Sequence, residues 1–160
     1  MKSRLKDEIK KRDPFESLEQ EVFLNLMRTA DVLARDIEEQ FKPIDLSATQ
    51  YNVLRILRGA GPKGLPTLEI AQRMIEQTPG ITRLIDHLET KTLVLRERCP
   101  TDRRQVFCRI SKEGLALLAR LDKPVQQAEE VALAGLSPRQ LTQLVTLLDR
   151  ARKGIQQEAS

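Results

Sequence analysis

The chain has 160 residues, of which 40% are hydrophobic and 3% aromatic, so it can bury one core built mainly from aliphatic side chains at helical spacing. Its two cysteines are too few for a disulfide framework, and no stretch approaches the roughly 20 apolar residues that cross a bilayer, which argues against a disulfide-rich secreted domain and a membrane protein. The formal charge of +4 is concentrated: residues 91–109 hold six basic and two acidic side chains, so this segment carries the whole excess and favours a polyanionic partner. We therefore expect a helix-rich, cytoplasmic protein.

The first predicted element is a long amphipathic helix from Phe15 to Phe41. Apolar residues recur there at intervals of three and four, and Pro43 ends the pattern. A helix of this length either pairs with a second subunit or crosses solvent within a monomer.

Two short helices are expected next. Ser47 and Gln50 have the spacing of a capping box, and the helix that they begin ends in the Gly- and Pro-rich segment 59–66, which includes a brief strand near Leu65. Thr67 is expected to cap the second of the two helices.

A third short helix follows a turn of a few residues. Thr78 is its expected N-cap, and Pro79 its first residue, where the missing N–H costs nothing. Its apolar residues have the i, i+3, i+4, i+7 spacing of a buried stripe, namely Ile81, Leu84, Ile85 and Leu88. The opposite face then carries Pro79, Thr82, Arg83, Asp86 and His87.

Two strand-like runs, Leu93–Cys99 and Gln105–Ile110, flank a turn at 100–104 and predict a basic β-hairpin. Ser111 is expected to begin a helix that is interrupted or kinked near Pro124, and residues 137–140 to open a final helix.

This order of helices and hairpin is typical of a winged helix-turn-helix, which binds duplex DNA. An α-helix fits the major groove, where Arg83 would donate two hydrogen bonds to a guanine edge and Thr82 would contact a phosphate or a thymine methyl. Thr78 is either a phosphate ligand at the helix N-terminus or a plain N-cap. The alternative for the whole polar face is an ordinary solvated helix surface.

The hairpin tip is the second candidate contact with DNA. Arg103 and Arg104 suit a narrow minor groove, where negative potential is concentrated. Asp102 is expected to pair with one of them and to fix its direction without touching DNA. A solvated charged turn is the alternative interpretation.

Residues from about Ser47 to Leu121 resemble the MarR family of bacterial regulators. The resemblance rests on the blocks Gln50-Tyr51-x-Val53-Leu54-Arg55, Glu69-Ile70-Ala71, Pro79-x-x-Thr82-Arg83-Leu84-Ile85-Asp86-x-Leu88-Glu89, Leu93-Val94, Asp102-Arg103-Arg104 and Ser111-x-x-Gly114. It implies a mainly α fold with a small β-hairpin. The implied parts are an N-terminal arm and dimerisation helix at 1–46, a winged helix-turn-helix DNA-binding domain at 47–110, and C-terminal dimerisation helices at 111–160.

The resemblance also implies a homodimer that binds double-stranded DNA at a pseudo-palindromic operator. Family members are mostly repressors released by small phenolic or other lipophilic ligands, or by oxidation, and an effector pocket is expected between the long first helix, the second helix and the winged lobe. Thr82 and Arg83 would be the contacts of the recognition helix, and Arg103 or Arg104 the contact of the wing. Their salt-bridge partners would be Asp102 and Asp86.

The sequence departs from the family pattern at two positions. Thr92 stands where the family usually has a glycine in a left-handed conformation, so a different cap or local strain is expected there. Leu95 stands where an arginine or lysine is frequent, which removes one possible contact with the DNA backbone.

The sequence bears on three other function classes. An enzyme is disfavoured because the chain has one histidine, no glycine-rich phosphate loop and no metalloprotease or triad motif, and neither a cofactor nor a metal site is predicted. A winged-helix adaptor that binds proteins stays open, since a fold does not dictate function. A redox-responsive regulator also stays open because Cys99 and Cys108 flank the wing, although packing at the hairpin is the plainer role for both.

Overall fold

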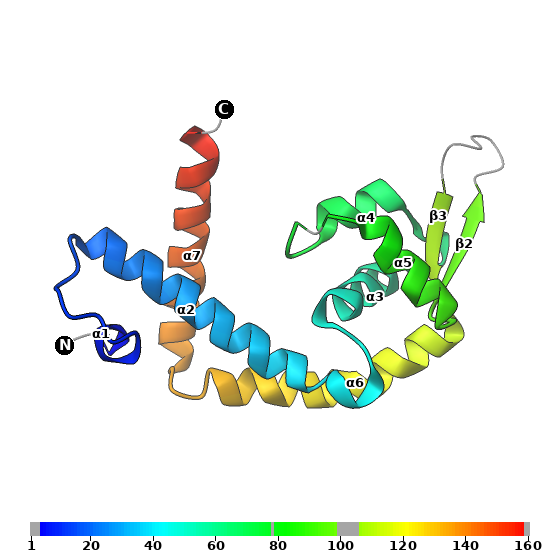
Figure 1. Cartoon of the computed structure of the whole chain (residues 1–160). Helices are drawn as coiled ribbons and strands as arrows, with labels where there is room; N and C mark the ends of the chain where they lie inside the picture. Colours follow the sequence, from blue (N-terminus) through cyan, green and yellow to red (C-terminus); the bar gives the residue numbers. More distant parts are fainter. Residues whose placement is uncertain (1–3, 78, 99–105, 159–160) are drawn as a thin grey trace. The chain divides into compact units, whose positions relative to one another are not determined.

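The structure is a computed structural model that describes residues 4–77, 79–98 and 106–158 (Figure 1). Helices dominate these residues, and three short strands form one antiparallel sheet. The mainly α fold with a small hairpin is therefore confirmed. The chain divides into two compact units, Met1–Val125 and Gln126–Ser160. Within the described residues, no helix combines the length and apolar character needed to cross a membrane.

The first unit opens with a short helix α1 (Leu5–Glu8) and the long helix α2 (Leu18–Glu39). The long helix was predicted to begin at Phe15, but it begins at Leu18 because the Ser17 hydroxyl accepts a hydrogen bond from the Gln20 amide at 3.1 Å. A single 3-10 turn, η1 (Lys42–Ile44), follows it. None of the residues of α2 is buried, although the helix is amphipathic.

Helix α3 (Ala48–Ala60) begins with the predicted capping box, in which Ser47 and Gln50 exchange two hydrogen bonds of 3.1 Å. A second 3-10 turn, η2 (Gly61–Lys63), leads to strand β1 (Leu65–Pro66) and helix α4 (Thr67–Arg73). The prediction that Thr67 caps α4 is wrong. Pro66 is the N-cap, and the Thr67 hydroxyl lies 3.7 Å from Cys108 Sγ, because pairing of β1 with β3 brings Thr67 to the sheet.

Helix α5 (Ile81–Thr90) begins two residues later than predicted. Gly80 is its N-cap and has a left-handed φ of 87°, which glycine adopts at little cost. Because this conformation is not that of a right-handed helix, α5 begins only after Gly80. Pro79 therefore lies in the turn before α5 and not at its first position. The predicted N-cap Thr78 lies outside the described residues.

Helix α5 ends in a Schellman turn at Thr92, which has a left-handed φ of 60°. The amide of Thr92 donates to Glu89 O at 2.8 Å, and the amide of Leu93 donates to Leu88 O at 2.9 Å. This is the backbone conformation that the usual glycine would adopt, so the predicted strain at this β-branched residue is found.

The sheet has the strand order β1-β3-β2 and is antiparallel throughout. Strands β2 (Val94–Arg98) and β3 (Val106–Ile110) form the predicted hairpin, and Arg96 lies opposite Cys108 in its register. The brief strand expected near Leu65 is also present, opposite Cys108 on the other edge of β3.

Two long helices complete the chain. Helix α6 (Lys112–Ala132) begins where predicted, with the Ser111 hydroxyl accepting from the Gly114 amide at 2.9 Å. The interruption expected at Pro124 is not found, since α6 continues through it, while a kink, the other expectation for a proline inside a helix, stays a prediction. Helix α7 (Pro138–Glu158) begins at Pro138, as Ser137 and Gln140 predicted.

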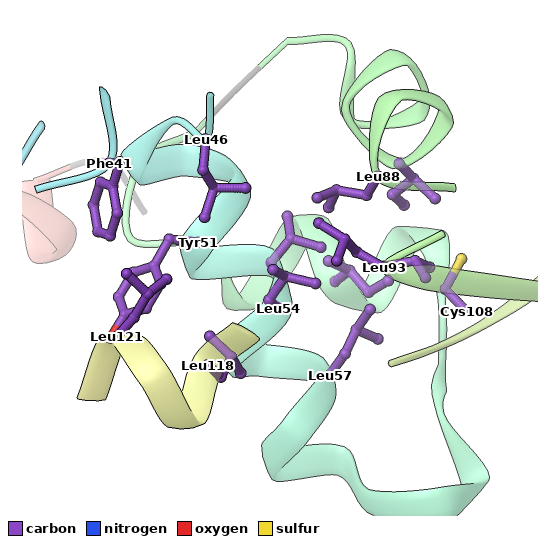
Figure 2. Close-up of a cluster of buried hydrophobic side chains, with 14 of the residues drawn as sticks. Phe41, Leu46, Tyr51, Leu54, Leu57, Leu88, Leu93, Cys108, Leu118 and Leu121 are labelled. Atoms are coloured by element: carbon purple, nitrogen blue, oxygen red, sulfur yellow. The ribbon is translucent and has the colours of Figure 1, made fainter. Parts of the chain in front are cut away.

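The core of the first unit lies beneath α5 and around α3 (Figure 2). Ile85 and Leu88 of α5 and Leu54 and Leu57 of α3 are fully buried. The Phe41 and Tyr51 rings, with centroids 4.7 Å apart, join the end of α2 to this core. Helix α5 is thus fixed by its apolar stripe, and its other face is available to a partner.

Candidate nucleic-acid interface

The polar face of α5 is the first part of the candidate interface. Its buried stripe holds Ile85 and Leu88, whereas the side chains on the other face are all exposed: Thr82, Arg83, Asp86 and His87. Pro79 is also exposed, in the turn before the helix. The predicted division of α5 into an inner and an outer face is therefore confirmed, and the role of the outer face in DNA binding stays a prediction.

The hairpin is the second part, and β2 packs beside α5 (Figure 1). Arg96 of β2 reaches across to α5. Its Nη2 donates to the Thr82 carbonyl at 3.2 Å and to the Asp86 carboxylate, and its Nε lies 3.5 Å from Glu89 Oε2. Arg96 was not among the predicted site residues. The available signal was the spacing of Thr82, Asp86 and Glu89 at i, i+4 and i+7, which places them on one side of a helix.

These contacts change the interpretation of the basic segment 91–109. Lys91 pairs with Asp45 at 2.8 Å, Arg96 pairs with Asp86 and Glu89, and Arg109 pairs with Glu97 at 2.9 Å. Most of the described basic side chains of this segment therefore have a carboxylate partner. The charge available to a polyanion is smaller there than the sequence count suggests.

Lys91 ties the C-terminal end of α5 to the turn after η1. Its Nζ donates to the backbone carbonyl and the carboxylate of Asp45, a residue with a left-handed φ of 50°. The hydrogen bond and the positive charge of Lys91 lower the pKa of Asp45 below its ordinary value. Helix α5 is thus held at its C-terminal end by Lys91 and along one side by Arg96.

Several predicted residues lie outside the described part of the chain. These are the N-cap candidate Thr78, the wing-tip residues Asp102, Arg103 and Arg104, and one of the two cysteines, Cys99. The salt bridge expected for Asp102 is therefore not described, while the described partner of Asp86 is Arg96.

Cys108 is fully buried in β3 and forms no disulfide. Burial raises the pKa of its thiol above the ordinary value, and a hydrogen bond with Thr67 opposes that shift only in part. Since the thiolate is the reactive form, this environment disfavours Cys108 as a redox sensor. Its role is packing, as the plainer interpretation held.

Neither of two hollows on the described surface includes a residue of the long first helix, which was expected to border an effector pocket. One, of about 100 Å³, is lined by residues of α3 and of the turn after α4, among them Asn52, Met74 and Ile75. The other is an open depression on α4 that includes Leu68 and Gln72. Among the described residues, no group of three or more His, Cys, Asp or Glu side chains is arranged to hold a metal ion.

Comparisons with known proteins agree with this geometry. A model of the MarR family matches residues 46–106. A MarR transcription factor from Planctomyces limnophilus is 45% identical, with a TM-score of 0.67 over 85% of this chain and 98% of its own. The chain also shares the fold of Escherichia coli MarR in complex with operator DNA, at 22% identity and a TM-score of 0.74 over 85% of this chain and 99% of that one. A Bordetella bronchiseptica protein, BpsR, whose DNA binding is regulated by 6-hydroxynicotinic acid, is 23% identical with a TM-score of 0.73, over 82% and 98% of the two chains.

Proposed function

Because this chain belongs to the MarR family of transcription factors, we propose that it is a sequence-specific repressor that binds a pseudo-palindromic operator as a homodimer. The observation that carries the proposal is the exposed polar face of α5 beside the hairpin. In this arrangement Arg83 donates to a guanine edge in the major groove, Thr82 contacts the DNA backbone or a thymine methyl, and His87 lies on the same face. Arg103 and Arg104 extend the contact into the adjacent minor groove.

The homodimer is supported by apolar side chains that the described residues leave exposed. On α2 six such side chains are between 40% and 70% exposed: Leu18, Val22, Phe23, Leu26, Met27 and Val32. On α7 the exposed set includes Leu144, Val145, Leu147 and Ile155. Contiguous apolar surface of this kind is typical of an interface between subunits. Residues 1–46 and 111–160 would then be the dimerisation regions on either side of a DNA-binding domain at 47–110.

We also propose that a small lipophilic or phenolic molecule releases the repressor from DNA. The support is the regulation of BpsR by 6-hydroxynicotinic acid, an aromatic ring that carries a hydroxyl and a carboxyl group, so it speaks for the hydroxylated aromatic class more than for a lipophilic one. Release by oxidation is disfavoured at Cys108 by its burial and its raised pKa. A regulator of this kind acts on chromosomal DNA, so we place it in the cytoplasm.

Fluorescence anisotropy tests the proposal, with the wild-type protein on a duplex from its own upstream region and on a scrambled duplex, each at two salt concentrations. Tighter and salt-sensitive binding to the upstream duplex is expected, because phosphate neutralisation releases counterions. Arg83→Ala should reduce the preference for the upstream duplex more than the total affinity. Arg104→Ala should weaken binding to both duplexes and lower the salt slope by about 1.

Arg120→Ala is the matched control, since it removes the same charge from an exposed position on α6. It should leave both affinities within about a factor of two. Equal discrimination by the wild type and Arg83→Ala would remove α5 from the proposal. Absence of any salt-sensitive DNA binding would favour the protein-binding adaptor instead.

A further inference from the structure

We propose that Arg96 is a positioning residue for DNA recognition: from β2 it fixes the rotation of α5 relative to the wing, so operator discrimination depends on a side chain that does not touch DNA. The inference rests on the proposed function, and it assigns a role to a residue that the basic composition of the hairpin would suggest as a DNA contact.

The geometry of two hydrogen-bond acceptors and one ion-pair partner carries the argument. The Thr82 carbonyl and the Asp86 carboxylate accept hydrogen bonds from Arg96 Nη2, whereas the Glu89 carboxylate pairs with Nε by charge at 3.5 Å and forms no hydrogen bond with it. All three groups lie along one side of α5, over two turns of the helix. A single guanidinium that contacts groups in successive turns resists rotation of the helix about its axis. A contact with one turn alone would leave the helix free to rotate about that point. The Thr82 carbonyl belongs to the residue next to Arg83, so the clamp acts directly beside the predicted base contact.

Arg96 is itself held in place. It lies opposite Cys108 in the hairpin register, and Cys108 is fully buried in the core. The Arg96 side chain is 23% exposed, and its Nε atom is buried. The clamp therefore connects α5 to a rigid strand and not to a mobile surface side chain.

The charges exclude the simpler interpretation of Arg96 as a phosphate ligand. Two carboxylates, from Asp86 and Glu89, already face the guanidinium and balance its charge. A phosphate would have to displace them and would meet their negative charge. For the same reason Asp86, a predicted DNA-binding residue, acts as the partner of Arg96 within the protein.

Base readout is sensitive to this kind of positioning, whereas backbone binding is not. A bidentate contact from Arg83 to guanine requires placement within about 0.5 Å and 10–20° and discriminates by about 1–3 kcal/mol. Contacts with phosphates tolerate small rotations because they depend mainly on charge. Loss of the clamp should therefore lower specific affinity and spare nonspecific affinity.

The test uses the full-length protein and a duplex that the wild type enriches from a randomised pool, compared with a scrambled duplex. Arg96→Met removes the clamp and keeps the aliphatic stem; Arg96→Lys keeps the charge and loses the planar donor fork. Arg109→Met is the matched control, because Arg109 pairs with Glu97 within the hairpin. We expect Arg96→Met to lower the preference for the enriched duplex about tenfold or more, Arg96→Lys to lower it by a smaller factor, and Arg109→Met to change it less than about threefold.

Two further readouts separate positioning from a loss of fold. First, the affinity of Arg96→Met for the scrambled duplex and the salt slope of that binding should match those of the wild type. Second, Arg96→Met should cause little further loss of preference in an Arg83→Ala background, since both substitutions act through the contact of Arg83 with guanine. A fall in both affinities with a salt slope lower by about 1 would identify Arg96 as a phosphate ligand and overturn the proposal. If Arg96→Met does not fold, an undiminished preference in Arg96→Lys would overturn it equally. A wild type that enriches no duplex would instead overturn the proposed function.

Discussion

Arg58 and Asp122 form a bidentate ion pair that joins α3 to α6. The two terminal nitrogens of Arg58 donate to the two carboxylate oxygens of Asp122 at 2.9 and 3.0 Å. These hydrogen bonds lower the pKa of Asp122 and raise that of Arg58 relative to their ordinary values. The pair therefore connects the helix-turn-helix to the first half of α6 through a contact whose strength depends on pH.

Asp122→Asn should lower the free energy of unfolding at pH 7 by about 0.5–1 kcal/mol, the range for a well-aligned but partly exposed pair. Because the pKa of Asp122 is lowered in the folded protein, this stabilisation is present above the ordinary carboxyl pKa of about 4 and is lost as the pH falls through the lowered value. Urea denaturation of both proteins at several pH values measures the difference. Asp36→Asn, on α2, is the control, and a difference that stays constant down to the lowest pH would contradict the prediction.

Gly114 is required at its position by the close approach of the Leu93 backbone, just before β2, and of the Ile110 side chain at the end of β3. A Cβ at residue 114 would lie 2.4 Å from the Leu93 carbonyl oxygen and 2.7 Å from Ile110 Cγ1. Gly114→Ala should therefore lower the free energy of unfolding by about 1–3 kcal/mol. The matched control is Gly59→Ala in α3, where nothing lies within 4 Å of an added Cβ, and which should stabilise by about 0.5–1 kcal/mol. Equal effects of the two substitutions in thermal unfolding would contradict this interpretation.

Thr92 offers the opposite case, a position where glycine should improve the protein. Its left-handed φ of 60° costs a β-branched residue roughly 1–2 kcal/mol, and the two backbone hydrogen bonds of the Schellman turn do not involve its side chain. The Thr92 hydroxyl donates to the Lys91 carbonyl at 2.7 Å on the exposed surface, where water can replace it. Thr92→Gly should raise the free energy of unfolding by about 1 kcal/mol. Thr90→Gly, in the last turn of α5, should lower it, because glycine weakens a helix. A destabilised Thr92→Gly variant in chemical denaturation would show that no strain is relieved there.

The sequence predicted the parts of this fold that depend on local chemistry. The capping box of Ser47 and Gln50 and the apolar stripe of α5 were found because the residues that interact lie within a few positions of each other. The resemblance to a family that has glycine at Thr92 left two alternatives, a different cap or local strain, and the left-handed φ of 60° corresponds to the second.

The remaining features depend on which strands pair and in what register. Thr67 lost its expected capping role because β3 brings Cys108 to its hydroxyl. Arg96 was missed because its acceptors on α5 come within reach only when the hairpin folds beside that helix. Periodicity along one element contains no information on such contacts between elements.

Cys108 should be unreactive in the native protein. Its thiol is fully buried, and its raised pKa keeps the thiolate fraction small at neutral pH. In a Cys99→Ser background, modification by a thiol reagent such as dithiobis(nitrobenzoate) should be slow under native conditions and fast in denaturant. The Cys108→Ser variant reports on Cys99 alone as the comparison. Rapid native modification of Cys108 would reopen the redox-responsive interpretation.

The exposed apolar side chains of α2 and α7 make the proposed homodimer testable without touching the core. Phe23 is 62% exposed and Val145 is 60% exposed, so neither substitution should unfold the subunit. Phe23→Glu and Val145→Glu should each convert a dimer to a monomer at micromolar concentration, because a buried interface leaves an inserted carboxylate without a partner. Deletion of the residues after Ser137 should have the same effect.

Sedimentation velocity and light scattering measure the outcome, with circular dichroism to establish that helix content is retained. Thr29→Glu is the control, since it places the same charge at an exposed polar position of α2 and should leave the dimer intact. A monomeric variant should also lose most of its operator affinity, because one recognition helix can then occupy only one of two half-sites. Dimers in both glutamate variants and in the truncated protein would place the subunit interface elsewhere and leave the apolar faces of α2 and α7 without this role.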